Sequence, residues 1–191
     1  MFTDKLIKDS EIVHIKMYDV FDNFLTNDEL TFTENYFKKP VWEFGHSTIA
    51  ADSDSSQKWF IAHLDHLPFF TEYLKEKIEN VIDLKCSLDR VYANGQTILN
   101  DGNWHIDDDY PDYITALLYI SDIDTRNVDQ IKGHTEFQMD NHIISLQPMK
   151  NRLVVFESSR PHRGLAPNVP GFLRISIAWK LKKITSREVQ N

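Results

Sequence analysis

Apolar and polar residues change their spacing about halfway along the chain, which indicates helices first and strands afterwards. Thr26 and Asn27 can cap a helix, and acidic residues follow at 28 and 29, so a helix is predicted to run to about Lys38 and to stop before Pro40. A second helix is predicted over residues 69–82. Its apolar stripe would consist of Phe70, Tyr73, Leu74, Ile78 and Val81. A loosely alternating stretch at 12–18 predicts a strand ahead of both helices.

The second half of the chain is typical of strands separated by Gly, Pro, Asn or Asp. Strands are predicted over residues 88–93, 113–120, 134–138, 142–146, 152–156 and 172–181. The run 113–120 is almost wholly apolar, so both of its faces should be covered. A turn is predicted at Asn94-Gly95. This order favours an α+β protein, mainly β, in which a sandwich or open barrel carries helices on its outside.

Composition limits the class of protein further. With 191 residues, 41% of them hydrophobic, the chain is expected to form a single domain with its own core. The lone cysteine, Cys86, excludes an intramolecular disulfide and suits a cytoplasmic location. The N-terminus shows no signal-peptide pattern, and no apolar run approaches the roughly 20 residues of a membrane span. A net charge of −8 argues against general nucleic-acid binding. Nothing in the pattern sets the oligomeric state.

A candidate metal site lies in the second half. Residues i and i+2 of a strand project from one face, so His105 and Asp107 can reach the same ion, and His162 can join them from a distant strand. Two imidazoles and one carboxylate form a facial ligand set for Fe(II) that leaves other positions open. Arg174 lies in an apolar run and therefore needs a buried partner. Its planar fork suits the far carboxylate of a dicarboxylic co-substrate, which points to oxidation by O2 with 2-oxoglutarate.

Two other stretches compete with this motif. The composition gives about one His-x-Asp/Glu match by chance, and the chain has three. The stretch 63–65 (His-Leu-Asp) lies in a polar segment before a helix and lacks a strand context. The stretch 134–136 (His-Thr-Glu) is the more serious rival, because His162 is also available to it. For Arg174, an acidic residue in the core is the alternative partner.

The residues around these motifs resemble the Fe(II)/2-oxoglutarate-dependent dioxygenase superfamily, and within it the prolyl-4-hydroxylase-like branch. The similar segments are residues 90–95, 132–137, 161–164 and 173–179, with Thr115 and Tyr119 matching between them. The resemblance implies a double-stranded β-helix, that is, a jelly-roll or cupin-like barrel, over about 86–183. It also implies a helical support region over about 1–85, and both regions would belong to one domain spanning 1–191.

The same resemblance assigns roles to individual residues. It implies that His105, Asp107 and His162 bind iron and that Arg174 binds the distal carboxylate of 2-oxoglutarate. Tyr92 and Tyr119 would donate hydrogen bonds to that co-substrate, although both could equally be core aromatics, and Ser176 would help Arg174. The resemblance makes His134 a wall of the site instead of a ligand. The implied cofactors are Fe(II), 2-oxoglutarate and O2, with ascorbate as a further candidate.

The predicted function is therefore hydroxylation of a C–H bond with release of succinate and CO2. The substrate would be a peptidyl residue, with proline favoured, or a small molecule. Two alternatives stay open: a cupin-like metalloenzyme that does not use 2-oxoglutarate, and a non-catalytic β-barrel that binds a partner. Residues 51–56 and 121–133 are the candidate lid loops.

Overall fold

The computed structural model describes residues 18–47 and 57–184. Two predictions fall wholly or mainly outside these ranges: the loop at 51–56 and most of the strand at 12–18. Within the described ranges, the first strand is β1 (Tyr18–Phe21). No helix in these ranges is long and apolar enough to cross a membrane.

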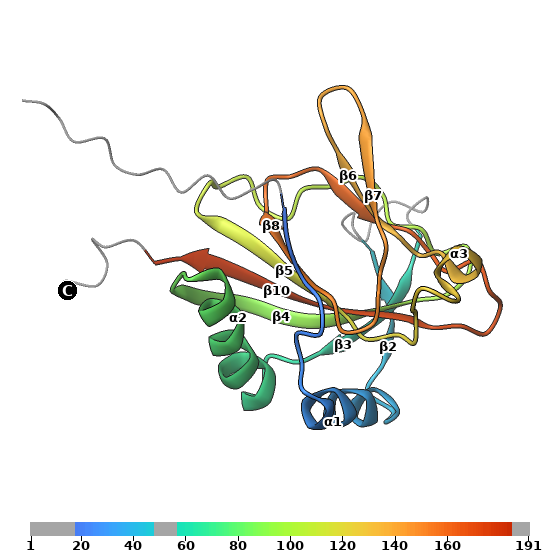
Figure 1. Cartoon of the computed structure of the whole chain (residues 1–191), viewed down its shortest axis with the longest axis horizontal. Coiled ribbons are helices and arrows are strands. Elements are labelled where there is room, and N and C mark those ends of the chain that lie inside the picture. Colours follow the sequence, from blue (N-terminus) through green and yellow to red (C-terminus); the bar gives the residue numbers. More distant parts are fainter. Residues whose placement is uncertain (1–17, 48–56, 185–191) are drawn as a thin grey trace, which may run out of the picture.

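Two antiparallel sheets make up most of the structure (Figure 1). The larger has seven strands in the order β1-β8-β5-β10-β4-β3-β2, and the smaller has three in the order β7-β6-β9. The remaining strands of the larger sheet are β2 (Glu43–His46), β3 (Trp59–His63), β4 (Cys86–Gln96), β5 (Tyr113–Tyr119), β8 (Leu153–Glu157) and β10 (Arg174–Lys183). Those of the smaller sheet are β6 (Thr135–Gln138), β7 (Ile143–Leu146) and β9 (His162–Gly164). The prediction of a mainly β protein with early helices is confirmed.

The helices begin and end close to the predicted positions. They are α1 (Asn27–Phe37) and, over the second predicted segment, a π-helical turn η1 (Phe69–Tyr73) followed by α2 (Leu74–Ile82). A further short helix, α3 (Val128–Ile131), was not predicted and lies within the stretch 121–133 that was expected to be a loop. Phe70, Leu74 and Ile78 are fully buried as predicted, whereas Tyr73 is 52% exposed and Val81 39%. The predicted apolar stripe is thus wrong at Tyr73 and Val81, which are not buried. The π-helical turn holds more residues than an α-helical one, which shifts Tyr73 out of phase with the buried face.

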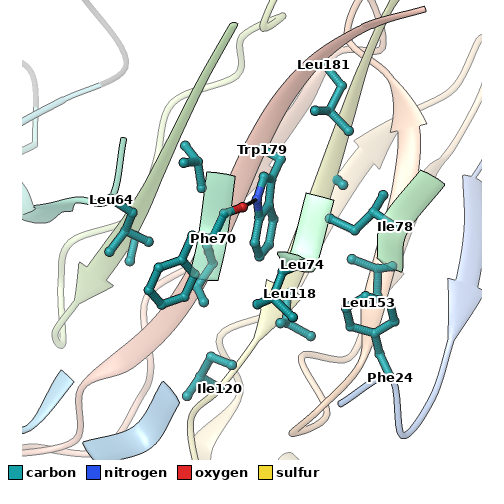
Figure 2. Packing of buried hydrophobic residues seen from close by; sticks show 14 of the residues in the cluster. Phe24, Leu64, Phe70, Leu74, Ile78, Leu118, Ile120, Leu153, Trp179 and Leu181 are labelled. Atoms are coloured by element: carbon teal, nitrogen blue, oxygen red, sulfur yellow. Dashed lines mark hydrogen bonds between the residues drawn. The ribbon is translucent and has the colours of Figure 1, made fainter. Parts of the chain in front are cut away.

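The core lies between the helices and one face of the larger sheet. Figure 1 shows α1 and α2 on one side of this sheet and β6 and β7 on the other. In Figure 2, Phe70 and Leu74 pack against Leu118 and Trp179, and the indole Nε1 of Trp179 donates a 2.8 Å hydrogen bond to the carbonyl of Phe70. The opposite face of β5 packs Leu117 and Tyr119 against the smaller sheet. Both faces of this strand are therefore covered, as its continuous apolar run predicted.

The predicted turn at Asn94-Gly95 is wrong, because β4 continues through both residues to Gln96. Gly95 pairs with Ile175 on one side and with Phe60 on the other. A Cβ on Gly95 would lie 3.0 Å from a ring carbon of Trp42 and 3.2 Å from Leu173 and Phe60. The glycine here permits close packing in the middle of a strand, and the Asn-Gly pair forms no hairpin.

Alternate residues of β4 and β10 project away from the helices toward the smaller sheet. Four directly opposed pairs share this face: Arg174 with Gln96, Ser176 with Asn94, Ala178 with Tyr92, and Lys180 with Arg90. All eight residues line one cavity of about 330 Å³. The sheet thus separates an apolar core on one face from a largely polar cavity floor on the other.

Glu29 joins α1 to the second helical segment. Its carboxylate completes a capping box with Thr26 and also accepts hydrogen bonds from Tyr73 and Lys77. Burial raises the pKa of this carboxyl, but the bonds from Lys77, Tyr73 and the Thr26 backbone outweigh it and lower the pKa to about 2.

We therefore predict that Glu29→Gln lowers the free energy of unfolding by about 2 kcal/mol at neutral pH. Because the folded pKa lies below the unfolded one, this contribution is complete above the unfolded value of 4.5 and is lost as the pH falls toward 2. Urea denaturation at pH 7 and pH 3 measures the difference. The control is Asp28→Asn, which removes an exposed charge from the same helical turn. An equal deficit at both pH values would contradict the assignment.

Candidate metal centre and adjoining cavity

His105, Asp107 and His162 converge at one end of the cavity. Their ligand atoms all lie within 4.8 Å of one another. The Nε2 atom of His105 is 3.4 Å from Oδ1 of Asp107, and Nε2 of His162 is 3.5 Å from Oδ2. No second group of this kind occurs in ranges 18–47 and 57–184. The three residues singled out from the sequence are thus the ones that the fold brings together.

The backbone that carries His105 and Asp107 is not the strand that the motif predicted. His105 forms a single isolated bridge with His162, and the residues around it are irregular. The two histidines exchange backbone hydrogen bonds, with N···O distances of 3.0 and 2.9 Å, and the amide of Asp107 donates to the carbonyl of Ser158 at 2.8 Å. These bonds hold the segment against β9 and the turn before it, so the ligands converge without a regular strand.

Both imidazoles are oriented by backbone carbonyls. Nδ1 of His105 lies 2.9 Å from the carbonyl oxygen of Asn103, and Nδ1 of His162 lies 2.8 Å from that of Arg160. A carbonyl can only accept a hydrogen bond, so each Nδ1 carries the proton and each Nε2 keeps its lone pair. Metal-binding histidines are commonly fixed in this way. The donor set therefore fits a divalent metal ion.

Burial and neighbouring charges set the protonation of the site. Burial lowers the pKa of His162 to about 4, so its imidazole is neutral near pH 7. Burial raises the pKa of Asp107, but the positive charge of Lys180 together with the contacts of His105 and His162 outweighs it, and the pKa lies well below its ordinary value. The Oδ2 atom of Asp107 accepts from Thr115 at 2.6 Å and pairs with Lys180. Oδ1 contacts neither Thr115 nor Lys180, and it is the oxygen that faces His105.

Arg174 lies at the other end of the paired β4 and β10 residues and is 2% exposed. Its guanidinium donates to neutral oxygens: Gly133 O at 2.6 Å, Gln96 Oε1 at 2.7 Å, Thr135 Oγ1 at 3.0 Å and Ser176 Oγ at 3.3 Å. Among the described residues, no carboxylate lies within 4.0 Å of it, so the alternative of a core acid is not met. A buried cation without a counter-ion is costly, and a bound anion would offset that cost.

Two glycines pack closely against Arg174. Gly133 has a φ of +80°, and a Cβ there would lie 2.9 Å from Cδ of Arg174. A Cβ on Gly164 would lie 3.1 Å from Oε1 of Gln96 and 3.6 Å from Nη1 of Arg174. A side chain at Gly133 would therefore collide with the stem of Arg174, and one at Gly164, which lines the cavity, would fill space beside the guanidinium.

Tyr119 and Ser176 both lie beside Arg174, but in different ways. Ser176 lines the cavity and accepts from Nη1 of Arg174. Tyr119 is 1% exposed and does not line the cavity; its hydroxyl donates to Thr135 Oγ1 at 2.7 Å, and its ring lies 5.3 Å from Cζ of Arg174. Direct contact of Tyr119 with a co-substrate stays a prediction, while its observed contacts position Arg174 and Thr135.

Tyr92 lines the cavity farther from Arg174. Its ring lies under two cations, with Cζ of Arg90 at 5.8 Å and Nζ of Lys180 at 5.9 Å from the ring centroid. Hydrogen bonding of Tyr92 to 2-oxoglutarate therefore stays a prediction, and its ring interacts with the opposite end of the paired β4 and β10 residues.

The competing motifs are not metal sites. His63 is the last residue of β3, contrary to the prediction that it lacks a strand context, and it faces Glu43 at 3.8 Å. Asp65 accepts a backbone hydrogen bond from Val91 at 2.8 Å. In the third motif, Glu136 pairs with Arg163 at 2.7 Å.

His134 does not line the cavity, whereas its neighbour Thr135 does. The expectation that His134 forms a wall of the site is therefore not met. Sequence reasoning also missed Lys180, which is 4% exposed. A usable signal existed, since Lys180 lies six residues after Arg174 in an apolar strand and so shares its face.

Comparison with known proteins finds solved structures that share this fold. No protein-family model matches the sequence, and none of the curated proteins matches it either. Solved structures do match in shape. A prolyl hydroxylase from Trichoplax adhaerens, in complex with a peptide of the hypoxia inducible factor oxygen degradation domain, gives a TM-score of 0.70 at 16% identity over 92% of this chain and 87% of that one.

Two further solved structures are similar to this chain in fold. A prolyl-4-hydroxylase from Pseudomonas putida gives a TM-score of 0.65 at 15% identity, covering 87% of this chain and 92% of that one. HygX from Streptomyces hygroscopicus, with nickel and 2-oxoglutarate bound, gives 0.61 at 11% identity over 88% and 83%. At these identities the likeness establishes the fold, which is that of the 2-oxoglutarate–Fe(II) oxygenases.

We predict that His105→Ala abolishes binding of Co²⁺, used as a spectroscopic probe of the site, because two ligands cannot hold the ion as three do. The visible absorption of the bound ion and equilibrium dialysis measure the loss. His134→Ala is the matched control, since it removes the histidine of the competing motif, and it should bind Co²⁺ like the wild-type protein. A loss of Co²⁺ in the control, with retention in His105→Ala, would contradict the assignment.

Proposed function

We propose that this protein is an Fe(II)- and 2-oxoglutarate-dependent dioxygenase that hydroxylates a C–H bond. The observation that carries the proposal is the pairing of two features in one cavity: a facial set of two histidines and one aspartate, and a buried arginine with no acidic partner among the described residues. Each feature occurs in other proteins for other reasons. Their combination on this fold suits a metal-chelating dicarboxylic acid.

Each side chain of the site would have a defined task. His105, Asp107 and His162 would hold Fe(II). Arg174 would bind the far carboxylate of 2-oxoglutarate, and Ser176, Gln96 and Thr135 would orient its guanidinium. With both groups bound, the chemistry that they supply is activation of O2, with conversion of 2-oxoglutarate to succinate and CO2. The protein would bind, orient and exclude water.

The fold supports a finer architectural proposal. The smaller sheet faces the β8-β5-β10-β4 part of the larger one across the cavity, and this is the arrangement expected of a double-stranded β-helix. We infer that residues of about 86–183 form that barrel and that α1, α2 and their flanking strands support it within a single domain. The packing of α1 and α2 against one face of the larger sheet is consistent with this division.

Peptidyl proline or another peptidyl residue is one proposed substrate, because two of the similar structures are prolyl hydroxylases and one of them holds a peptide. Fold alone is a weak guide to substrate, so a small molecule is an equal candidate.

The contacts of Arg174 disfavour a cupin-like enzyme that does not use 2-oxoglutarate, since such an enzyme has no need of a buried unpaired arginine. The intact ligand set disfavours a non-catalytic barrel.

We predict that the Fe(II)-loaded protein releases succinate from 2-oxoglutarate even without a primary substrate. We also predict that Arg174→Gln raises the Kd for 2-oxoglutarate by about a hundredfold, because a charge-assisted bidentate contact is lost. Calorimetric titration under anaerobic conditions measures this Kd. The exposed Arg126 supplies the control, and Arg126→Gln should bind 2-oxoglutarate normally. Unchanged affinity in Arg174→Gln would contradict the role given to Arg174, and a wild-type protein that neither binds 2-oxoglutarate nor releases succinate from it would favour the cupin-like alternative.

A further inference from the structure

The cavity is positively charged although the whole chain carries a net charge of −8. Three permanent cations line it, Arg90, Arg174 and Lys180, and Asp107 is the sole carboxylate among the described residues of its lining. Bound Fe(II) would add two positive charges, and 2-oxoglutarate would remove two. On the proposed function, the loaded site would thus keep a surplus of positive charge.

This surplus lies at one end of the cavity. Arg174 engages neutral oxygens at the start of β10, and a co-substrate carboxylate would bind there. Lys180 lies six residues farther along the same strand, and its Nζ atom pairs with Asp107, one of the three candidate metal ligands. Of the two carboxylates of a bound 2-oxoglutarate, one would pair with Arg174 and the other, together with Asp107, would offset the two charges of the metal. The charge at Lys180 and Arg90 is therefore left for a second ligand.

Arg90 and Lys180 are directly opposite each other on neighbouring strands, with both side chains on the cavity face. Like charges in such a cross-strand position destabilise a sheet. The β-bulge between Lys180 and Leu181, where Leu181 pairs with Leu88, falls at this pair. Bulges of this kind often re-aim side chains beside active sites.

Neighbouring carboxylates do not fully compensate the charges of Lys180 and Arg90. Lys180 pairs with Asp107, but Asp107 would also bind the metal, so one carboxylate would face two cations. Arg90 approaches Asp89 at 3.9 Å, and its side chain is 54% exposed. It therefore keeps donors available at the cavity mouth.

Aromatic side chains complete the same end of the cavity. The Tyr92 ring lies within 6 Å of both cations, as given above. Trp59 also lines the cavity, with its ring packed against His46 at 5.7 Å between centroids. The pKa of His46 is lowered, first by burial and then by the charges of Arg90, His63 and Lys180. His46 is thus neutral near pH 7, and it can donate to or accept from a ligand without adding charge.

We propose that Arg90 and Lys180 form an anion-binding subsite for the primary substrate, which therefore carries a carboxylate or a similar oxyanion close to the C–H bond that is oxidised. This inference rests on the proposed function for the identity of the reaction. It narrows the substrate class to anionic molecules, either free small acids or acidic side chains within a peptide. A neutral prolyl residue without an adjacent acid would leave the two cations uncompensated.

The first test measures anion binding without turnover. The full chain is loaded with Zn²⁺ and saturated with 2-oxoglutarate, so that Arg174 is occupied, and is then titrated with sodium sulfate in a calorimeter. We expect sulfate to bind wild-type protein about tenfold more tightly than Arg90→Gln, because a charge-assisted contact is lost. Arg90 is chosen because Lys180 also contacts Asp107, and Arg126→Gln serves as the control. Equal affinity in wild type and Arg90→Gln, or no binding in wild type, would overturn the proposal.

The second test identifies the source of the anion. Succinate release is measured with matched pairs: free carboxylic acids against their primary amides, and capped peptides containing Asp or Glu against those containing Asn or Gln. The acid of a pair should stimulate release above the substrate-free level more than its amide does. Arg90→Glu should remove or reverse that preference. Amides that stimulate as well as acids in the wild type would contradict the inference.

The two proposals fail in different ways. If sulfate binds as expected but succinate never forms, the proposed oxygenase reaction is wrong and the anion subsite stands. If succinate forms without added substrate but sulfate binding does not depend on Arg90, the reaction stands and the subsite is wrong.

Discussion

The two-sided character of β10 is the constraint on which the rest of the structure depends. This strand pairs with β4 on one side and β5 on the other, and consecutive residues project to opposite faces. Ile177, Trp179 and Leu181 enter the core beneath the helices, whereas Arg174, Ser176 and Lys180 enter the cavity. A shift of one residue in register would bury the charges in the core and expose Trp179 to the cavity. Core packing therefore also fixes where the guanidinium and the ammonium lie.

The sequence could predict the elements that local pattern controls. The two helices, the apolar strand β5 and most later strands were found because periodicity and caps act over short distances. The metal ligands were found because their residue types are restricted by coordination chemistry. Regular structure at His105 was predicted wrongly, since the bridge to His162 depends on a contact between residues far apart in the chain. The strand through Gly95 was missed because the glycine there makes room for the ring of Trp42, a residue far away in the sequence.

The cavity could be predicted only in part for the same reason. Arg174 was notable as a charge inside an apolar run, and Lys180 carried the same signal six residues later, three repeats of the strand pleat farther on. That Lys180 opposes Arg90 depends on strand register and on a β-bulge, and neither can be deduced from one sequence. The roles of Gln96 and Thr135 likewise follow from their contacts with Arg174, because a glutamine and a threonine have no distinctive pattern of their own.

The paired backbone hydrogen bonds between His105 and His162 have a consequence for how the protein acquires its metal. The peptide links that carry two of the three ligands are already tied together by the fold, and their imidazoles are already turned by carbonyl oxygens. The conformational entropy of ordering these ligands is lost when the chain folds, before the ion binds. Small metallo-domains differ, because they fold only around their ion. Loading and removal of the ion can then proceed as a local exchange within an intact globule.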